Sequence, residues 1–294
     1  MMLYGSISGI LKDPFMTEIL VRAVVVGVLV SLCASLLGVT LVLKRYSMIG
    51  DGLSHVGFGA LAIATALNLN NASMAVSLPI VLVAAFLLMG TSFRRRMQGD
   101  AAIAVLSTGA IAVGTLLFRF SKNQYADICN SLFGTASMST LSKTDLWITV
   151  AVSVLVLLLF VLFYTRIFSV TFDETFARAT GIPTGVYSML LAGLTAVTVV
   201  IGMKMVGAIM VSGLIVFPAL SAMRVCKRFR SVVLTSAALS LVCFFAGFFL
   251  SLVLDAQPGP AIITVHVAVF LLCTLIGRIK TRIKTVNSKK IVVE

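Results

Sequence analysis

Charged side chains are scarce in this sequence. Lysine, arginine, aspartate and glutamate together make up 11% of the residues, whereas apolar residues make up 60%. A soluble domain normally carries about 25% charged residues, so this composition excludes a soluble monomer. The sequence predicts an all-α, polytopic membrane protein, because helices satisfy their own backbone hydrogen bonds inside lipid.

Groups that usually carry catalysis are also few. The chain has only two histidines and ten acidic residues, and it lacks a GxxxxGK[S/T] phosphate loop, an HExxH motif and an evident Ser/His/Asp set. We therefore expect no enzymatic activity and no ATP binding through a phosphate loop in this chain. The absence of a CxxC pair argues against a disulfide framework or a thiolate metal site. The five cysteines are scattered at Cys33, Cys129, Cys226, Cys243 and Cys273.

Long apolar runs dominate what is present. Nine of them approach the roughly 20 residues that a helix needs to cross a bilayer. They lie at about 16–43, 52–67, 74–93, 101–118, 145–165, 184–203, 205–223, 231–254 and 260–278. We predict a transmembrane bundle of eight to nine helices over residues 1–280 and a short basic cytoplasmic tail at 281–294. The first run is too long for a cleavable signal peptide and lacks a small-residue cleavage site.

The net charge of +13 reflects membrane orientation rather than nucleic-acid binding, because the basic residues cluster between apolar runs and in the tail. The clusters expected in the cytoplasm are Lys44-Arg45, Arg94–Arg96, the loop 166–178, the stretch 224–230 and the tail from Arg278 to Lys290. Nine spans then place the C-terminus inside and the N-terminus outside. Lys12 and Arg22 argue weakly for the alternative, which has eight spans and an internal N-terminus.

Asp51 and His55 are the first candidate site. They lie four residues apart at the start of an apolar run, so a helix would put both on one face. An ionisable pair there is costly unless it faces a cavity, a partner or an ion. Carboxylate and imidazole both suit zinc, manganese or iron, and a second copy of the chain or water could complete the ligand set. The alternative is that Asp51 caps the helix and His55 is a hydrogen-bonded core residue.

The stretch 173–183 is the second candidate site. Acidic residues come first, an arginine follows, and Gly181-Ile182-Pro183 ends the pattern, which predicts a short cytoplasmic helix between two spans. The helix is either an ordinary connection or a docking element for a cytosolic partner.

Two further positions are weaker candidates. Pro218 lies late in an apolar run and should break one backbone hydrogen bond, as in an ordinary kinked helix or beside a lined cavity. His266 lies about two turns into the last run, where it is either packed or a direct metal ligand.

Several ordered motifs resemble the permease subunits of bacterial zinc/manganese/iron ABC importers. Residues 44–56 read KRYSMIGDGLSHV, close to the family's RRxSLIGDALSHA. Residues 173–182 read DETFARATGI, and residues 206–222 resemble the family's VGxLLVxALLIxPAAxA stretch. Leu132-Phe133-Gly134 followed by Asp145 also fits. The resemblance covers nearly the whole chain.

The resemblance implies a transport path through Asp51 and His55 in a homo- or heterodimer of permeases. It implies a coupling helix at 173–183 that docks on a cytoplasmic ATP-binding subunit, and delivery of the metal by an extracytoplasmic binding protein at the inner membrane. The residues matched to that coupling function are Asp173, Glu174, Phe176, Ala177, Arg178, Gly181 and Ile182. Gly52, Pro260 and His266 depart from the family pattern.

Other functions stay open on the residues alone. An ABC importer for a metal chelate, such as a siderophore or cobalamin, would have a wide path without a polar pair. An ion transporter that works without ATP would carry its ion in vesicles without nucleotide. A membrane enzyme would turn over a substrate as the purified chain.

Overall fold

The structure, a computed structural model, describes residues 14–67, 69, 73–89, 99–120, 129, 132 and 143–291. Every regular element in these ranges is a helix, as the sequence predicts. The elements are α2 (Pro14–Leu43), α3 (Ser47–Ala66), α4 (Ser73–Met89), α6 (Gly99–Leu117), η2 (Phe118–Phe120), α8 (Lys143–Leu162), α9 (Tyr164–Phe172), α10 (Glu174–Ala179), α11 (Thr184–Val206), α12 (Ala208–Val225), α13 (Phe229–Leu254) and α14 (Pro258–Ile291).

Each of the nine predicted apolar segments coincides with a helix, but fewer of them could cross a membrane by length and composition alone. Within the described ranges, five helices meet that condition, or six if α8 and α9, which meet at 67°, form one broken span. The predicted count of eight to nine is therefore somewhat high. The apolar parts of α4 and α6, Met74–Met89 and Ala101–Leu117, are shorter than 18 residues, and α3 contains Asp51 and His55 among its apolar residues.

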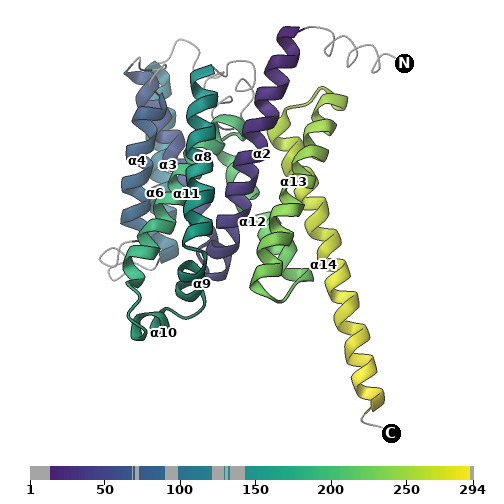
Figure 1. The fold of residues 1–294 in the computed structure, drawn as a ribbon. Coiled ribbons are helices and arrows are strands. Elements are labelled where there is room, and N and C mark those ends of the chain that lie inside the picture. Colours follow the sequence, from purple (N-terminus) through teal and green to yellow (C-terminus); the bar gives the residue numbers. More distant parts are fainter. Residues whose placement is uncertain are drawn as a thin grey trace.

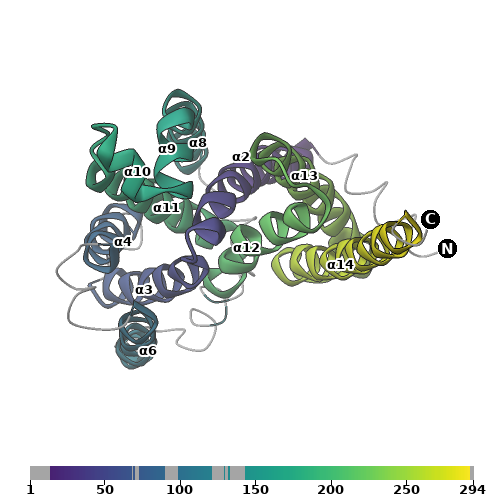
Figure 2. The ribbon, with the colours of Figure 1, turned by 90° about the horizontal axis from the view of Figure 1, so that it is seen from below.

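The helices form a bundle with α2 near its middle (Figures 1 and 2). One hydrophobic core joins α2, α3, α4, α11 and α12, and a second joins α2, α8, α11 and α13. Buried hydroxyls tie α2 to α13: the Ser31 and Ser240 Oγ atoms lie 2.7 Å apart, and Ser236 donates to the carbonyl of Ser35. In lipid, small residues of this kind allow helices to pack closely.

Two tight turns set the course of the chain through the bundle. Gly207 alone separates α11 from α12, with φ at 92°, a conformation that side chains with a Cβ rarely adopt. Residues 44–46 join α2 to α3, with Arg45 at φ 60°.

The turn at residues 44–46, α10 and the end of α14 lie toward one end of the bundle, and α2 begins at the other (Figure 1). The described part of the chain thus begins and ends at opposite ends of the bundle. The predicted tail at 281–294 is not separate from the last span, because α14 continues to Ile291 and projects beyond the other helices. No glycine or proline interrupts that stretch.

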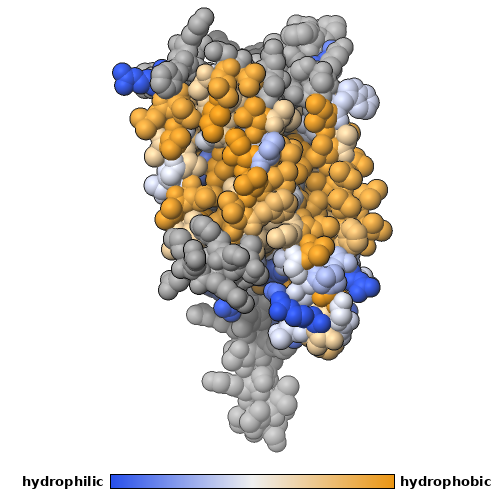
Figure 3. All heavy atoms as spheres, turned by 90° about the vertical axis from the view of Figure 1, so that its left-hand side faces the viewer, coloured by the Kyte–Doolittle hydropathy of each residue, from blue (hydrophilic) through white to orange (hydrophobic). Residues whose placement is uncertain are grey.

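The outer surface fits a lipid environment. On the face drawn in Figure 3, hydrophobic residues form a broad band, and hydrophilic residues gather toward the end that carries α10. Large apolar side chains such as Val161, Leu234 and Leu116 are exposed by about 70%. Together with the apolar helices, this surface makes the chain a multi-pass membrane protein.

Candidate metal site and coupling helix

Asp51 and His55 lie on one face of α3, within its first three turns. The two residues beside Asp51 are glycines that face different neighbours. A Cβ added to Gly50 would lie 3.2 Å from Ile215 on α12, and one added to Gly52 would lie 2.7 Å from Ile103 on α6. Asp51 therefore lies on the side of α3 between the faces that meet α12 and α6.

The spacing of the pair suits chelation of a single cation. His55 Nε2 lies 3.6 Å from Asp51 Oδ2, and their side chains are 15% and 39% exposed. Two ligands that are each about 2.1 Å from an ion at the tetrahedral angle would lie about 3.4 Å apart. The pair could hold an ion with little movement of either side chain.

Among the described residues, no third strong metal ligand lies beside the pair. No three histidine, cysteine or acidic residues in the described ranges lie close enough to hold a metal ion. The hydroxyl of Ser212 on α12 lies within hydrogen-bonding reach of the Asp51 carboxylate. Nδ1 of His55 is buried and has no hydrogen-bond partner among the described residues.

His266 does not join this pair. It is 2% exposed on α14, and its Nδ1 lies 2.9 Å from the carbonyl oxygen of Ile262. Since a carbonyl only accepts, Nδ1 carries the proton and donates it. Nε2 is buried without a partner in the part of the chain that the structure describes.

Pro218 lies inside α12, which continues without interruption from Ala208 to Val225. The proline removes one backbone donor, so the carbonyl of Leu214 loses its usual partner. The Ser221 hydroxyl donates to the carbonyl of Phe217 at 2.8 Å. The expected break is thus a single lost hydrogen bond within a helix and not an unwound segment.

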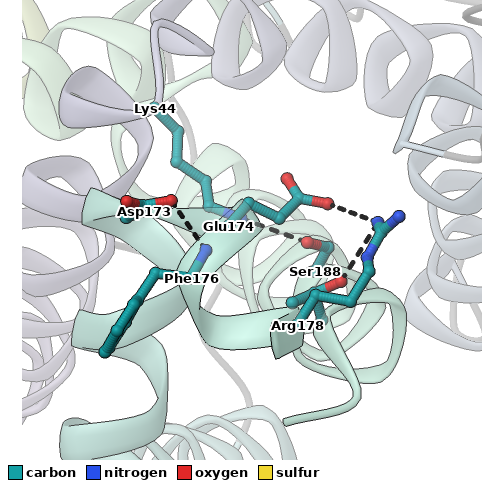
Figure 4. Close-up of polar contacts among 7 residues, drawn as sticks. Lys44, Asp173, Glu174, Phe176, Arg178 and Ser188 are labelled. Atoms are coloured by element: carbon teal, nitrogen blue, oxygen red, sulfur yellow. Dashed lines mark hydrogen bonds and ion pairs between the residues drawn. The ribbon is translucent and has the colours of Figure 1, made fainter. Parts of the chain in front are cut away.

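The predicted cytoplasmic helix is α10, and local contacts explain why it forms. The Asp173 carboxylate accepts a hydrogen bond from the Phe176 backbone N–H at 2.9 Å, which caps the first turn (Figure 4). One turn later, the Arg178 guanidinium lies 3.2 Å from the Glu174 carboxylate and 3.3 Å from the Thr184 hydroxyl on α11. Arg178 therefore links α10 to the start of α11.

Apolar contacts hold one side of α10 and leave the other free. Ala177 is fully buried and belongs with Ile182 to a small core that also includes Val170 on α9. The preceding residue, Phe176, faces away from this core and is 64% exposed. After α10, Gly181 turns the chain at φ 81° into α11. An anchored helix with an exposed aromatic residue is a surface suited to a protein partner.

A hydrogen bond connects this region to the turn before α3, the helix that carries Asp51 and His55. Lys44, in the turn before α3, donates to the Ser188 hydroxyl on α11 at 3.1 Å (Figure 4). Ser188 lies one turn after Thr184, which accepts from Arg178. The polar contacts thus run from α10 through α11 to the turn that begins α3.

Sequence reasoning found Asp51, His55 and α10 but not the residues that join them. The sequence places Lys44 in a basic cluster and in the motif at 44–56, and Ser212 in the motif at 206–222, but it assigns no contact to Lys44, Thr184, Ser188 or Ser212. Serine and threonine occur throughout apolar helices, so no local signal marks these three. Their partners lie far away in the sequence, 144 residues for Lys44 and Ser188.

The sequence of this chain is similar to those of known transport proteins. Residues 16–277 match the family described as the ABC 3 transport family. A probable metal transport system membrane protein from Thermotoga maritima is 33% identical over 249 residues, which are 85% of this chain and 86% of that protein. The manganese transport system membrane protein MntC of Halalkalibacterium halodurans is 29% identical over 252 residues, which are 85% of each chain.

A solved structure has the same arrangement of helices. A chain of PsaBC from Streptococcus pneumoniae, determined in complex with Fab, superposes with a TM-score of 0.79 at 25% identity. The match covers 92% of this chain and 94% of that one.

Proposed function

The chain belongs to the ABC 3 transport family, and we propose that it is the membrane-spanning subunit of an ATP-driven importer for a divalent transition-metal ion. Manganese, zinc and iron are the candidate ions. The observation that carries the proposal is the separation of 3.6 Å between Asp51 Oδ2 and His55 Nε2 on a face of α3 that lies beside α6 and α12. The metal-transport names of the relatives from Thermotoga maritima and Halalkalibacterium halodurans support it.

The path is formed by two permease subunits, identical or related. One chain offers a carboxylate and an imidazole, which are too few for a complete coordination shell. A second copy or close relative facing the first would bring an equivalent pair, and water would fill any remaining position. A modest ligand set also suits transport, because the ion must leave as readily as it enters.

ATP is hydrolysed on separate cytoplasmic subunits that dock on α10. This chain contains no phosphate-loop motif, so the energy has to come from a partner. The capped helix offers Phe176 on its exposed side and is held to α11 through Arg178. Movement of the ATPase subunits would therefore reach the bundle through α10.

The cycle is alternating access in the bacterial cytoplasmic membrane. An extracytoplasmic metal-binding protein delivers the ion to the outer end of the path. Closure of the ATPase subunits moves α10, the bundle opens toward the cytoplasm, and the ion passes Asp51 and His55. ATP hydrolysis resets the complex.

The test is uptake of labelled manganese, zinc and iron by cells that express the complete transporter. Asp51→Asn and His55→Gln preserve side-chain size, and either should abolish uptake while the chain still inserts and co-purifies with its ATPase. Asp255→Asn is the matched control, because Asp255 is an exposed acid at φ 50°, which asparagine also adopts, at the end of α13. Wild-type uptake by both variants of the pair, or uptake only of a siderophore or cobalamin, would refute the proposal.

A further inference from the structure

We infer that Ser212 on α12 is a third donor to the cation held by Asp51 and His55, and that its hydroxyl oxygen helps to set which metal is preferred. This inference rests on the proposed function, because it assumes that a divalent transition metal passes the pair. It adds a residue from a second helix to a site that otherwise belongs to α3 alone.

The packing of α12 against α3 brings Ser212 to the site. Ile215 on α12 lies against Gly50, where an added Cβ would be 3.2 Å from its Cδ1 atom. Ser212 precedes Ile215 by three residues and so lies on the same face of α12, one turn away. Its hydroxyl contacts the Asp51 carboxylate, and both side chains are partly exposed.

The hydroxyl has two competing acceptors for its one proton. Ser212 Oγ lies 3.0 Å from the carbonyl oxygen of Ile209, one turn back on α12. The carboxylate of Asp51 is the other acceptor, and neither acceptor can donate in return. A serine hydroxyl can donate to only one of them at a time, while its oxygen retains two lone pairs.

A cation would decide between the two arrangements. Once a metal occupies the lone pairs of the Asp51 carboxylate, the hydroxyl proton is no longer needed there. The hydroxyl can then donate to the carbonyl of Ile209, and its oxygen lone pairs become available to the metal. No proton enters or leaves the site, because the hydroxyl only rotates.

The donor set that results is two oxygens and one imidazole nitrogen from each chain. Oxygen donors favour harder ions such as manganese, whereas a thiolate in the same place would favour zinc and other softer ions. Ser212 therefore adds a hard ligand, and its replacement should change the ratio of metals carried more than it changes the folding of α12.

The experiment measures the ratio of manganese to zinc uptake in cells that express the complete transporter, normalised to the amount of chain in the membrane. Ser212→Ala should lower manganese uptake about tenfold relative to zinc, by analogy with the loss of other metal-supporting contacts. Ser212→Cys should lower the ratio further, and Ser212→Thr, which keeps the hydroxyl, should restore it. Thr and Cys variants also keep the test informative if the Ala variant is poorly inserted.

Ser169 on α9 provides the matched control. Its hydroxyl also bonds back to a helix carbonyl, that of Thr165 at 3.0 Å, but it lies outside α3 and α12. Ser169→Ala and Ser169→Cys should leave the metal ratio unchanged. An unchanged ratio in all Ser212 variants would overturn this inference. If Asp51→Asn still abolishes uptake in that case, the proposed function survives and only the role of Ser212 fails.

Discussion

Replacing Lys44 with methionine should disconnect α10 from α3, the helix of the candidate metal site, without removing either helix. Lys44 donates to Ser188 on α11 from the turn that leads into α3, and methionine keeps most of its length but not its charge. A hydrogen bond to a charged group is worth about 1.5–3 kcal/mol. If that free energy favours one of two conformations, its loss changes the equilibrium constant between them about 10- to 150-fold.

The turn is stiff enough to transmit such a difference. The N–H groups of Lys44, Arg45 and Tyr46 all donate to carbonyls at the end of α2, and the N–H of Ile49 donates to the carbonyl of Tyr46. A displacement of Ser188 should therefore shift the first turns of α3 as a unit. In Lys44→Met, ATP hydrolysis should continue while the number of ions moved per ATP falls.

The assay is simultaneous measurement of ATP hydrolysis and metal uptake by the reconstituted complex. Because Lys44 also makes other contacts, Ser188→Ala and the double variant complete a double-mutant cycle that isolates the Lys44–Ser188 pair. Lys227→Met, at an exposed lysine between α12 and α13, is the control for lost positive charge. An unchanged ratio of ions to ATP in Lys44→Met, or effects of the two single changes that simply add, would refute the reasoning.

Three further predictions concern the coupling helix and the packing around the site. Asp173→Ala removes the cap of α10, which costs about 1 kcal/mol, and should make α10 more sensitive to limited proteolysis; Asp173→Asn, another good cap, should be nearly neutral. Phe176→Ala should weaken co-purification of the ATPase while leaving thermal stability unchanged, because the side chain is mostly exposed; full recovery of the ATPase would contradict a docking role. Gly38→Ala should lower the free energy of unfolding by about 1–3 kcal/mol, because the new Cβ would collide with the backbone carbonyl of Ile215, which cannot rotate away. The thermal midpoint of the purified chain should fall accordingly. A midpoint equal to wild type would mean that α2 and α12 can separate at that point.

The helices and their order could be predicted because lipid leaves few alternatives. Every backbone polar group must be satisfied within its own segment, so a long apolar run can only be a helix. The count was less secure, because α3 carries polar residues and α4 and α6 are short. The extension of α14 into the basic tail was missed, since charge alone does not end a helix.

Only part of the candidate site could be predicted from the sequence. Asp51 and His55 could be paired because four residues on a helix make one turn, which is a local geometric rule. Their exposure depends on how α6 and α12 pack against Gly52 and Gly50, and no local rule contains that contact. His266 shows the converse, because the sequence offered it as a possible ligand and the packing keeps it away from the pair.

The sequence by itself determined that this protein is a helical membrane bundle with a carboxylate and an imidazole one turn apart and a short helix within residues 173–183. These features depend on composition and on spacings of a few residues, which the backbone geometry converts directly into structure. Only the tertiary structure decided that Ser212 meets Asp51 and that Lys44 reaches Ser188. Those contacts join residues more than 140 positions apart, and they exist only because close helix packing brings α12 and α11 against α3 and the turn before it.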